Sequence, residues 1–428
     1  MTCDLLIKDT IIIPMDGRKP FRGFLAVDDG IITFCDEGEC DLEADEEIDG
    51  SGYIITPGFL NAHLHGDFYV FKGLLDNMPL REQYHKTNRL YDLMNEDAMV
   101  LSRTLAYAEA VRAGATYIVE HSFRNPGERT IEPFRAVGVR GAVTLDISGL
   151  ESGLTDLLVE NGIDVFINAP SEEDFDYSYL KDIAEISDRM GYKVYAHVAE
   201  TTWRIAICEE RFGIGPIELL HKTGILRRKP VLVHACWLSN RDIDLIADNS
   251  ATIVSTPVSE MKLGDGVTPI PKLLRKGAKV ALGTDGALWN NGADILAEAK
   301  AMVLIHSLNS TPGAITESNA LDALTSMGAE AVGVEGIGKL QKGMNASFVL
   351  FSANSPEICP IFISEKISNL ESALIMSAGS RAIDSVYVCG RKVMSDGYII
   401  LSDTLGLLEE AGNWLMSIGG RIENILKE

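Results

Sequence analysis

Residues 54–66 read IITPGFLNAHLHG, an apolar run that ends in two histidines separated by one residue. Side chains of an extended strand alternate between its faces, so the imidazoles of His63 and His65 are predicted to project from the same side. Two imidazoles placed in this way can hold one cation. An isolated His-x-His is more often a pair of ordinary surface or core histidines, so the rest of the chain has to decide between these interpretations.

Seven further apolar runs of the same kind follow, separated by polar loops and helical patterns. With residues 58–64, the runs cover 115–120, 140–145, 164–169, 193–197, 230–234, 251–255 and 279–284. Continuous apolar runs are typical of strands buried on both faces, as in a parallel sheet covered by helices. Helical spacing predicts two of these helices at 179–190 and 240–249. Eight such units in roughly 250 residues match an α/β fold, the (β/α)8 TIM barrel, with an open doubly wound sheet as the alternative.

The two ends of the chain have a different pattern from the middle. Residues 1–56 and about 340–400 contain short apolar stretches broken by turn signals, and 405–426 has the pattern of a closing helix. Two all-β pieces at opposite ends of a barrel pack most simply against each other. The predicted organisation is therefore a small β-sandwich domain formed by residues 1–56 and 340–428, the latter including the helix, around a barrel at 57–339.

Composition and charge limit the possible partners and the compartment. The net charge of −24 argues against nucleic acid or an anionic membrane as a partner, because both require a basic face. The first residues lack the basic region and cleavage site of a signal peptide, and no run reaches the ~20 apolar residues that cross a bilayer. The seven scattered cysteines favour reduced thiols over a disulfide framework. These features predict a cytoplasmic protein.

Polar side chains capable of binding metal stand at the ends of four of the predicted strands. They are His63 and His65, His197, His234, and Asp285. Because the active sites of such barrels lie at the carboxyl ends of the strands, these side chains are expected to converge. Imidazoles with a carboxylate suit Zn²⁺ with one position left open for water, and Fe²⁺ would also fit. A metal held there lowers the pKa of water toward ~7, so hydrolysis is the expected chemistry.

Further candidates for catalysis lie near these strand ends. Glu200 stands three residues beyond His197, where a carboxylate can move a proton between water, substrate and leaving group. Asp285 can bind the metal and still accept a proton, and His234 either hydrogen-bonds the attacking hydroxide or binds the metal itself. His121 follows the second predicted strand and is a candidate for the substrate pocket. His85, His221 and His306 are expected to be structural or solvent-exposed.

The chain resembles the amidohydrolase superfamily, in the cytosine deaminase-like branch that contains chlorohydrolases, triazine hydrolases and the deaminases of S-adenosylhomocysteine and methylthioadenosine. The motifs that carry this resemblance extend over nearly the whole chain: PGFLNAHLH from Pro57, FKG from Phe71, HVAET from His197, VHAC from Val233, MKLG from Met261, GTDG from Gly283 and GKLxKG from Gly338. The resemblance implies that His63, His65, His197 and Asp285 bind one metal. It also implies that Glu200 relays a proton to a ring nitrogen of the substrate and that His234 orients the hydroxide.

The chain departs from the pattern of the branch at several positions. Related enzymes with two metals use a lysine after the fourth strand, but residues 164–170 contain none, which favours one metal. The same segment lacks the histidine that members acting on adenine nucleosides place there. Glu260 replaces an amide, which would favour a substrate that presents N–H donors or positive charge unless it faces solvent. Trp289 either stacks on a planar substrate or packs at the barrel rim.

The expected function is a metal-dependent aminohydrolase that releases ammonia from an amino-substituted N-heterocycle of the purine, pyrimidine, nucleoside, pterin or triazine type. A hydrolytic dechlorinase or a cyclic amidohydrolase would use the same residues and is the alternative. The expected partner is the small-molecule substrate, and analogy with the family allows a homo-oligomer. The identity of the heterocycle, the choice between zinc and iron, and the oligomeric state stay open at this point.

Overall fold

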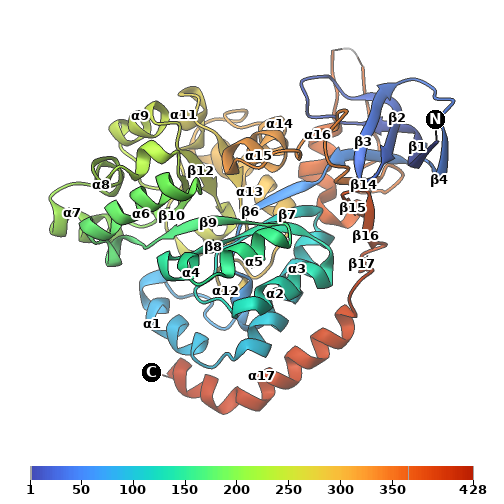
Figure 1. The fold of residues 1–428 in the computed structure, drawn as a ribbon. Helices are drawn as coiled ribbons and strands as arrows, with labels where there is room; N and C mark the ends of the chain where they lie inside the picture. Colours follow the sequence, from blue (N-terminus) through green and yellow to red (C-terminus); the bar gives the residue numbers. More distant parts are fainter. Residues whose placement is uncertain (1, 365, 428) are drawn as a thin grey trace.

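A computed structural model describes residues 2–364 and 366–427. Its centre is a parallel eight-stranded sheet wound into a nearly closed barrel, surrounded by helices (Figure 1). The strands are β6 (Phe59–Leu64), β7 (Ala115–Glu120), β8 (Arg140–Leu145), β9 (Ile163–Ala169), β10 (Val194–Val198), β11 (Val231–His234), β12 (Thr252–Ser255) and β13 (Val280–Leu282). All eight coincide with the predicted apolar runs. The predicted TIM barrel is confirmed, and the doubly wound alternative is excluded.

The barrel closes between its first and last strands through main-chain and side-chain contacts. The N–H groups of Thr284 and Asp285 both donate to the carbonyl oxygen of His63, at 2.9 Å each. The Asn61 amide donates to the Thr284 hydroxyl at 2.8 Å and accepts from the Thr284 N–H at 3.1 Å. Gly283 is required here because a Cβ at this position would lie 2.5 Å from the Cβ of His63.

Seventeen α-helices in the described residues connect the strands or extend the termini. They are α1 (Leu80–Tyr91), α2 (Glu96–Arg112), α3 (Ile131–Val137), α4 (Ile147–Glu151), α5 (Leu154–Glu160), α6 (Tyr177–Met190), α7 (Thr202–Phe212), α8 (Pro216–Thr223), α9 (Asn240–Asp248), α10 (Pro257–Leu263), α11 (Ile270–Arg275), α12 (Ala287–Asn290), α13 (Ile295–Asn309), α14 (Glu317–Leu324), α15 (Ser326–Val332), α16 (Leu370–Ser372) and α17 (Thr404–Lys427). The two helices predicted from spacing are α6 and α9. Helix α6 begins where the Asp176 side chain accepts from the Tyr179 N–H, and it ends at Gly191, whose φ of 76° is favoured by glycine.

The terminal segments together build a second, mixed sheet of nine strands. In order these are β17 (Tyr398–Ile399), β16 (Arg391–Ser395), β15 (Ile383–Val388), β14 (Phe348–Ser352), β5 (Tyr53–Pro57), β1 (Thr2–Ile12), β2 (Phe21–Asp28) and β3 (Ile31–Glu37), with β4 (Glu43–Asp49) paired to β1. Strands β5 and β14 join the two ends of the chain, as the blue and red strands of Figure 1 show. This arrangement confirms an additional β domain made from both termini.

Two features of the terminal regions go beyond the sequence prediction. Strand β4 was missed because its sequence, EADEEID, is acidic and lies on the exposed edge of the sheet, where no apolar alternation is needed. Helix α17 packs against α1 and α2 on the barrel (Figure 1).

The domain limits at 56/57 and 339/340 stay a prediction, and the outer limits at residues 1 and 428 lie outside the described residues.

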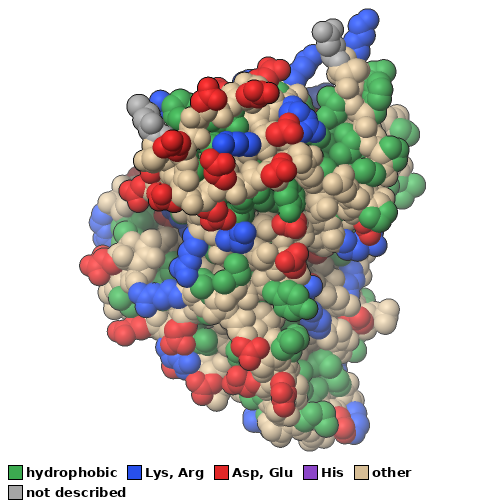
Figure 2. All heavy atoms as spheres, turned by 90° about the vertical axis from the view of Figure 1, so that its right-hand side faces the viewer, with side chains coloured by type: hydrophobic (Ala, Val, Ile, Leu, Met, Phe, Trp, Pro, Cys, Tyr) green, Lys and Arg blue, Asp and Glu red, His purple; other side chains and the backbone are tan. Residues whose placement is uncertain are grey.

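The surface agrees with the acidic composition. On the face drawn in Figure 2, carboxylates and basic side chains are interspersed among apolar ones, and the described residues form no continuous basic patch there. None of the helices in the described residues has the length and apolarity needed to cross a membrane. The exclusion of nucleic acid stays a prediction from the charge.

Replacing Asn61 with alanine is expected to weaken the closure of the barrel. The substitution removes both side-chain bonds to Thr284 and leaves buried polar groups unpaired, so the free energy of unfolding should fall by about 2–4 kcal/mol. Urea denaturation checks this, with the exposed Asn309→Ala as the matched control. Equal stability of the two variants would contradict the role of Asn61 in closure.

Candidate metal and active site

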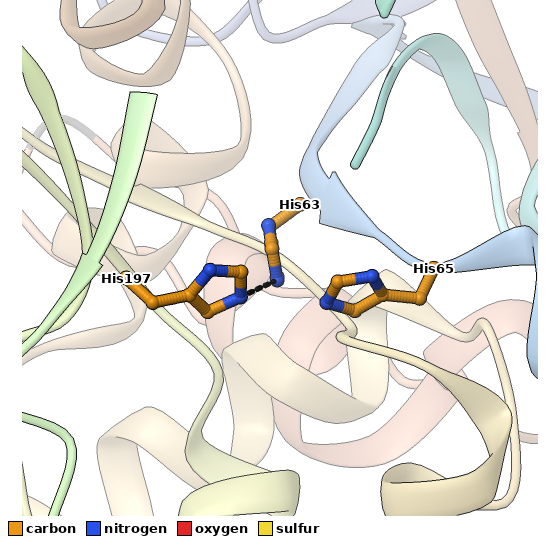
Figure 3. Close-up of side chains that lie close together, drawn as sticks. All are labelled: His63, His65 and His197. Carbon is orange, nitrogen blue, oxygen red and sulfur yellow. Dashed lines mark hydrogen bonds between the residues drawn. The ribbon is translucent and has the colours of Figure 1, made fainter. Parts of the chain in front are cut away.

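Three histidines from two strands meet at the carboxyl end of the barrel. His63 lies in β6 and His65 directly follows it, while His197 lies in β10. Figure 3 shows their rings turned toward one another, and one nitrogen from each lies within 4.8 Å of the others. The Nε2 atoms of His63 and His197 are 3.2 Å apart. The structure therefore brings together three of the four predicted metal ligands as a compact cluster of nitrogen donors.

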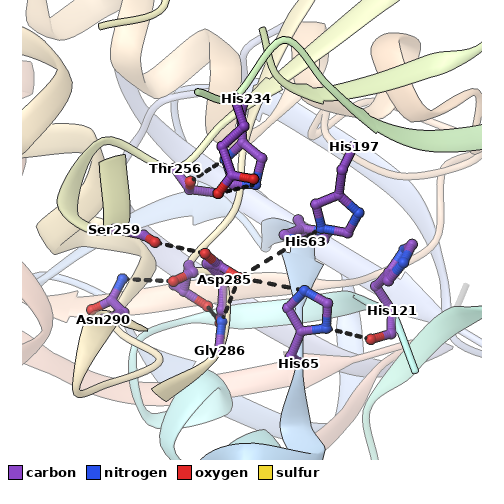
Figure 4. A network of polar contacts seen from close by, with 12 residues as sticks. His63, His65, His121, His197, His234, Thr256, Ser259, Asp285, Gly286 and Asn290 are labelled. Atoms are coloured by element: carbon purple, nitrogen blue, oxygen red, sulfur yellow. Dashed lines mark hydrogen bonds and ion pairs between the residues drawn. The ribbon is translucent and has the colours of Figure 1, made fainter. Parts of the chain in front are cut away.

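Asp285, the fourth predicted ligand, faces the same cluster from the end of β13. Its Oδ1 atom lies 3.4 Å from Nε2 of His65 and 3.7 Å from Nε2 of His63. The Ser259 hydroxyl donates to Oδ2 at 2.6 Å and the Gly286 N–H donates to Oδ1 at 2.8 Å (Figure 4). The backbone of Asp285 has a φ of 60°, a strained value for a residue with a side chain. The carboxylate is thus fixed in place from several directions.

The protonation of this cluster suits a cation. Burial lowers the pKa of His63 to about 3, and burial also lowers the pKa of His65 and His197, so these imidazoles are neutral near pH 7. Burial raises the pKa of Asp285, but the close imidazoles of His63 and His65 outweigh it and leave the pKa below its usual value. Nδ1 of His65 donates to the His121 carbonyl oxygen at 2.6 Å, which leaves the Nε2 lone pair directed at the cluster.

Glu200 and His234 lie beside the cluster. Oε1 of Glu200 is 3.6 Å from Nε2 of His234, and the other ring nitrogen of His234 is 3.1 Å from the Thr256 hydroxyl. Burial alone lowers the pKa of His234, but the nearby carboxylates of Glu200, Glu260 and Asp285 raise it to about 9. The predicted proton carrier and the predicted orienting histidine are therefore neighbours, as the proposed roles require.

Glu260 occupies a different place from the one that the sequence suggested. Its side chain is buried rather than exposed to solvent, and it is absent from the residues that line the cavity at the site. One oxygen lies 3.8 Å from Nδ1 of His234, and the carboxylate accepts from the Thr256 N–H at 2.9 Å and from the Thr268 hydroxyl at 3.2 Å. This position favours holding His234 over contact with a substrate, so a substrate contact by Glu260 stays an unsupported prediction.

A cavity of about 290 Å³ opens over the cluster. Its lining includes His121 and Trp289, the other two predicted substrate contacts. The His121 ring lies 4.5 Å from that of His197, and its Nδ1 is buried with no hydrogen-bond partner among the described residues. Trp289 packs edge-on against His65, with ring centres 5.2 Å apart. Trp289 thus packs at the rim and also forms part of the wall.

Three residues at the site were not singled out from the sequence. Arg204, four residues after Glu200, and Glu173, in the short helix η3 (Glu172–Asp174), both line the cavity. Asp265 is a buried carboxylate whose pKa is raised to about 8, first by burial and then by the charge of Glu200. The spacing of Glu200 and Arg204 by four residues was the one available clue, because side chains four residues apart on a helix are neighbours.

The Amidohydrolase family profile matches residues 54–393, which include every residue of this site. The chain belongs to the amidohydrolase family. Among characterised relatives, the 5-methylthioadenosine/S-adenosylhomocysteine deaminase of Desulforudis audaxviator is 28% identical over 95% of this chain and 97% of its own length. The 5′-deoxyadenosine deaminase of Methanopyrus kandleri is 29% identical over 91% of this chain and 93% of its own length.

Solved structures share the same architecture. A zinc-bound adenosine deaminase from Xanthomonas campestris superposes with a TM-score of 0.90 and 22% identity, covering 99% of both chains. A zinc complex of atrazine chlorohydrolase from Arthrobacter aurescens has a TM-score of 0.84 and 18% identity, covering 96% of this chain and 100% of that one. At these identities the likeness confirms the fold, the TIM barrel with its additional domain.

Replacing Glu260 with glutamine is expected to lower the pKa of His234 below about 9, because one of the charges that stabilises the imidazolium is removed. A folded-state pKa above the unfolded value of about 6.5 stabilises the fold at low pH, and this stabilisation is lost as pH rises through about 9. The variant should lose part of that pH dependence. Histidine NMR titration of the metal-free protein measures the change, with the surface variant Glu330→Gln as control, and an unchanged His234 titration would refute the contact.

Proposed function

We propose that the protein is a metal-dependent aminohydrolase that deaminates an amino-substituted N-heterocycle and releases ammonia. One observation carries the proposal: Glu200 and His234 lie next to a buried cluster of three histidines and Asp285. Both residues line the cavity over this cluster, and the chain belongs to the amidohydrolase family. Deaminases among the relatives support the reaction type. The enzyme class that results is the hydrolases that act on C–N bonds other than peptide bonds.

The residues at the site fit one divalent metal ion. His63, His65 and His197 offer neutral nitrogen donors, and Asp285 offers an ionised oxygen held by Ser259. This mixed donor set is the kind that zinc accepts, and iron(II) is the second possibility. A metal bound there supplies a Lewis acid that makes hydroxide available near neutral pH. The absence of a lysine in β9 supports one metal rather than two.

Glu200 performs the proton transfers. Its carboxylate accepts a proton from the attacking water and passes it to the ring nitrogen next to the carbon that bears the amino group. The oxygen of that water bonds to the same carbon. The proton that remains on the added hydroxyl group then passes through Glu200 to the amine, because an amide anion is too poor a leaving group to depart unprotonated. The C–N bond to the amino group breaks as the C=O double bond forms, and ammonia leaves. His234, held by Thr256 and Glu260, orients the attacking water.

The substrate occupies the cavity between aromatic and polar walls. Trp289 offers an aromatic face, and the unpartnered Nδ1 of His121 offers a polar contact for a ring substituent. The relatives act on adenine nucleosides, but Asn168, Ala169 and Pro170 line this cavity without the histidine that such enzymes place there. A purine, pyrimidine, nucleoside, pterin or triazine that carries an amino group is therefore the proposed substrate class.

We also propose a cellular compartment, a partner and an oligomeric state for the protein. All seven cysteines are free thiols, which supports a reducing, cytoplasmic compartment. The small-molecule substrate is the proposed partner, and a homo-oligomer is proposed by analogy with the family alone.

Replacing Glu200 with glutamine is expected to lower kcat by about 10²- to 10⁴-fold, the usual contribution of general acid–base catalysis. The metal content should stay near that of the wild type, because Glu200 lies outside the ligand set. Ammonia release measures the change in kcat, and metal analysis of the same preparation measures the metal content. Undiminished turnover would remove Glu200 from the mechanism.

Zinc is expected to raise the thermal unfolding midpoint of the metal-free protein, since an ion that binds only the folded chain stabilises it. At a free zinc concentration 100 times the dissociation constant, the gain is about 2.7 kcal/mol. His197→Ala should lose most of the shift, whereas His221→Ala, on helix α8 and away from the cluster, should keep it. A full shift in His197→Ala would contradict the proposed ligand set.

Ammonia release across aminopurines, aminopyrimidines, adenosine derivatives, pterins and aminotriazines tests the function itself. We expect one class to be deaminated by the zinc-loaded protein and the activity to be lost in Asp285→Ala. Chloride release from a chlorotriazine, or opening of a cyclic amide with no ammonia from any compound, would instead favour the dechlorinase or cyclic amidohydrolase.

A further inference from the structure

Arg204 is a buried cation in direct contact with the proposed proton carrier. It lies in the first turn of helix α7, where its main-chain N–H donates to the Thr201 side chain that caps the helix. One terminal nitrogen, Nη1, forms a short ion pair with Oε2 of Glu200. The other, Nη2, pairs with Oε1 of Glu173 at 2.8 Å. A single guanidinium thus bridges Glu200 and the loop that carries helix η3.

Because of the ion pair with Arg204, the two carboxylate oxygens of Glu200 have different partners. Oε2 is taken by Arg204, while Oε1 lies 3.6 Å from Nε2 of His234. A planar guanidinium holds a carboxylate with more directional control than a rotating ammonium does, so this pair restricts rotation of the Glu200 carboxylate. Only Oε1 is then free to exchange protons with water and substrate.

Further acidic groups surround Glu200 and Arg204. Asp265 and Glu200 are neighbouring buried carboxylates, and Glu172, which accepts from the Ala199 N–H at 2.5 Å, adds negative charge beside Arg204. Without Arg204, the Glu200 carboxylate would lose this ion pair and keep only weaker polar neighbours, His234 at 3.6 Å and the Asp265 carboxyl group. An unpaired buried charge is expensive, so the carboxylate would move or change its hydrogen bonds.

We propose that Arg204 is a positioning residue for catalysis, which fixes Glu200 so that Oε1 faces His234 and the reacting atoms. The inference rests on the proposed function, because it assigns Arg204 a task in the same reaction. Both terminal nitrogens of Arg204 are already engaged by carboxylates, which argues against a role in binding an anionic group of the substrate. The role is therefore in turnover and not in affinity.

The test compares Arg204→Met and Arg204→Lys with Arg211→Met. Arg211 is the matched control because it lies on the same helix and holds the same loop through the carbonyl oxygens of Glu173 and Phe175, at 2.7 Å each. For the substrate found in the ammonia assay, kcat of Arg204→Met should fall about 10- to 100-fold, the usual cost of a misplaced catalytic group. KM should stay within about twofold, and Arg204→Lys should recover part of kcat because it keeps the charge.

A second variant guards against misfolding. Arg204→Met combined with Glu173→Gln removes one positive and one negative charge together, so Glu173 is not left as an unpaired anion. It should show the same fall in kcat. Unchanged kcat in a folded Arg204 variant, an equal fall in Arg211→Met, or a raised KM with unchanged kcat would overturn the positioning role. A wild type that releases no ammonia from any compound would overturn the proposed function and this inference together, whereas an active wild type with an equally active variant overturns the inference alone.

Discussion

Closure of the barrel between β6 and β13 is the constraint on which the site depends. The carbonyl oxygen of His63 accepts hydrogen bonds from the N–H groups of both Thr284 and Asp285. The main chains of two metal-ligand candidates, His63 and Asp285, are thus bonded directly to each other. The side chains of His63 and Asp285 consequently approach within 3.7 Å from opposite ends of the barrel sequence. Separating β6 from β13 would therefore open the barrel and also disperse the cluster of metal-ligand candidates.

That closure also forces polar groups into a place where water cannot solvate them. Burial drives the imidazoles of His63, His65 and His197 toward their neutral forms, which preserves the nitrogen lone pairs. A set of lone pairs and one carboxylate facing each other is costly unless a cation lies between them. The same desolvation that makes the cluster unfavourable when empty favours a cation between these groups.

The sequence predicted the parts of the molecule that repeat a strong physical pattern. Strands buried on both faces have continuous apolar sequences, so all eight barrel strands could be located, and their carboxyl ends showed where the histidines would meet. Strand β4 could not be found because an exposed edge strand needs no apolar residues. Arg204 and Glu173 are 31 residues apart in sequence, and only the folded loop of η3 brings them together.

Glu260 shows most clearly what pattern alone leaves out. The sequence identified a carboxylate where relatives have an amide and suggested a substrate contact or a solvent-exposed loop. In the fold, the first turn of α10 directs the side chain back toward the Thr256 N–H and His234. His234 therefore has a carboxylate near each ring nitrogen, Glu200 at Nε2 and Glu260 at Nδ1. Two such neighbours restrict the orientation of the ring, because each ring nitrogen faces a carboxylate. In place of the suggested substrate contact, Glu260 therefore contacts the histidine that is proposed to orient the attacking water.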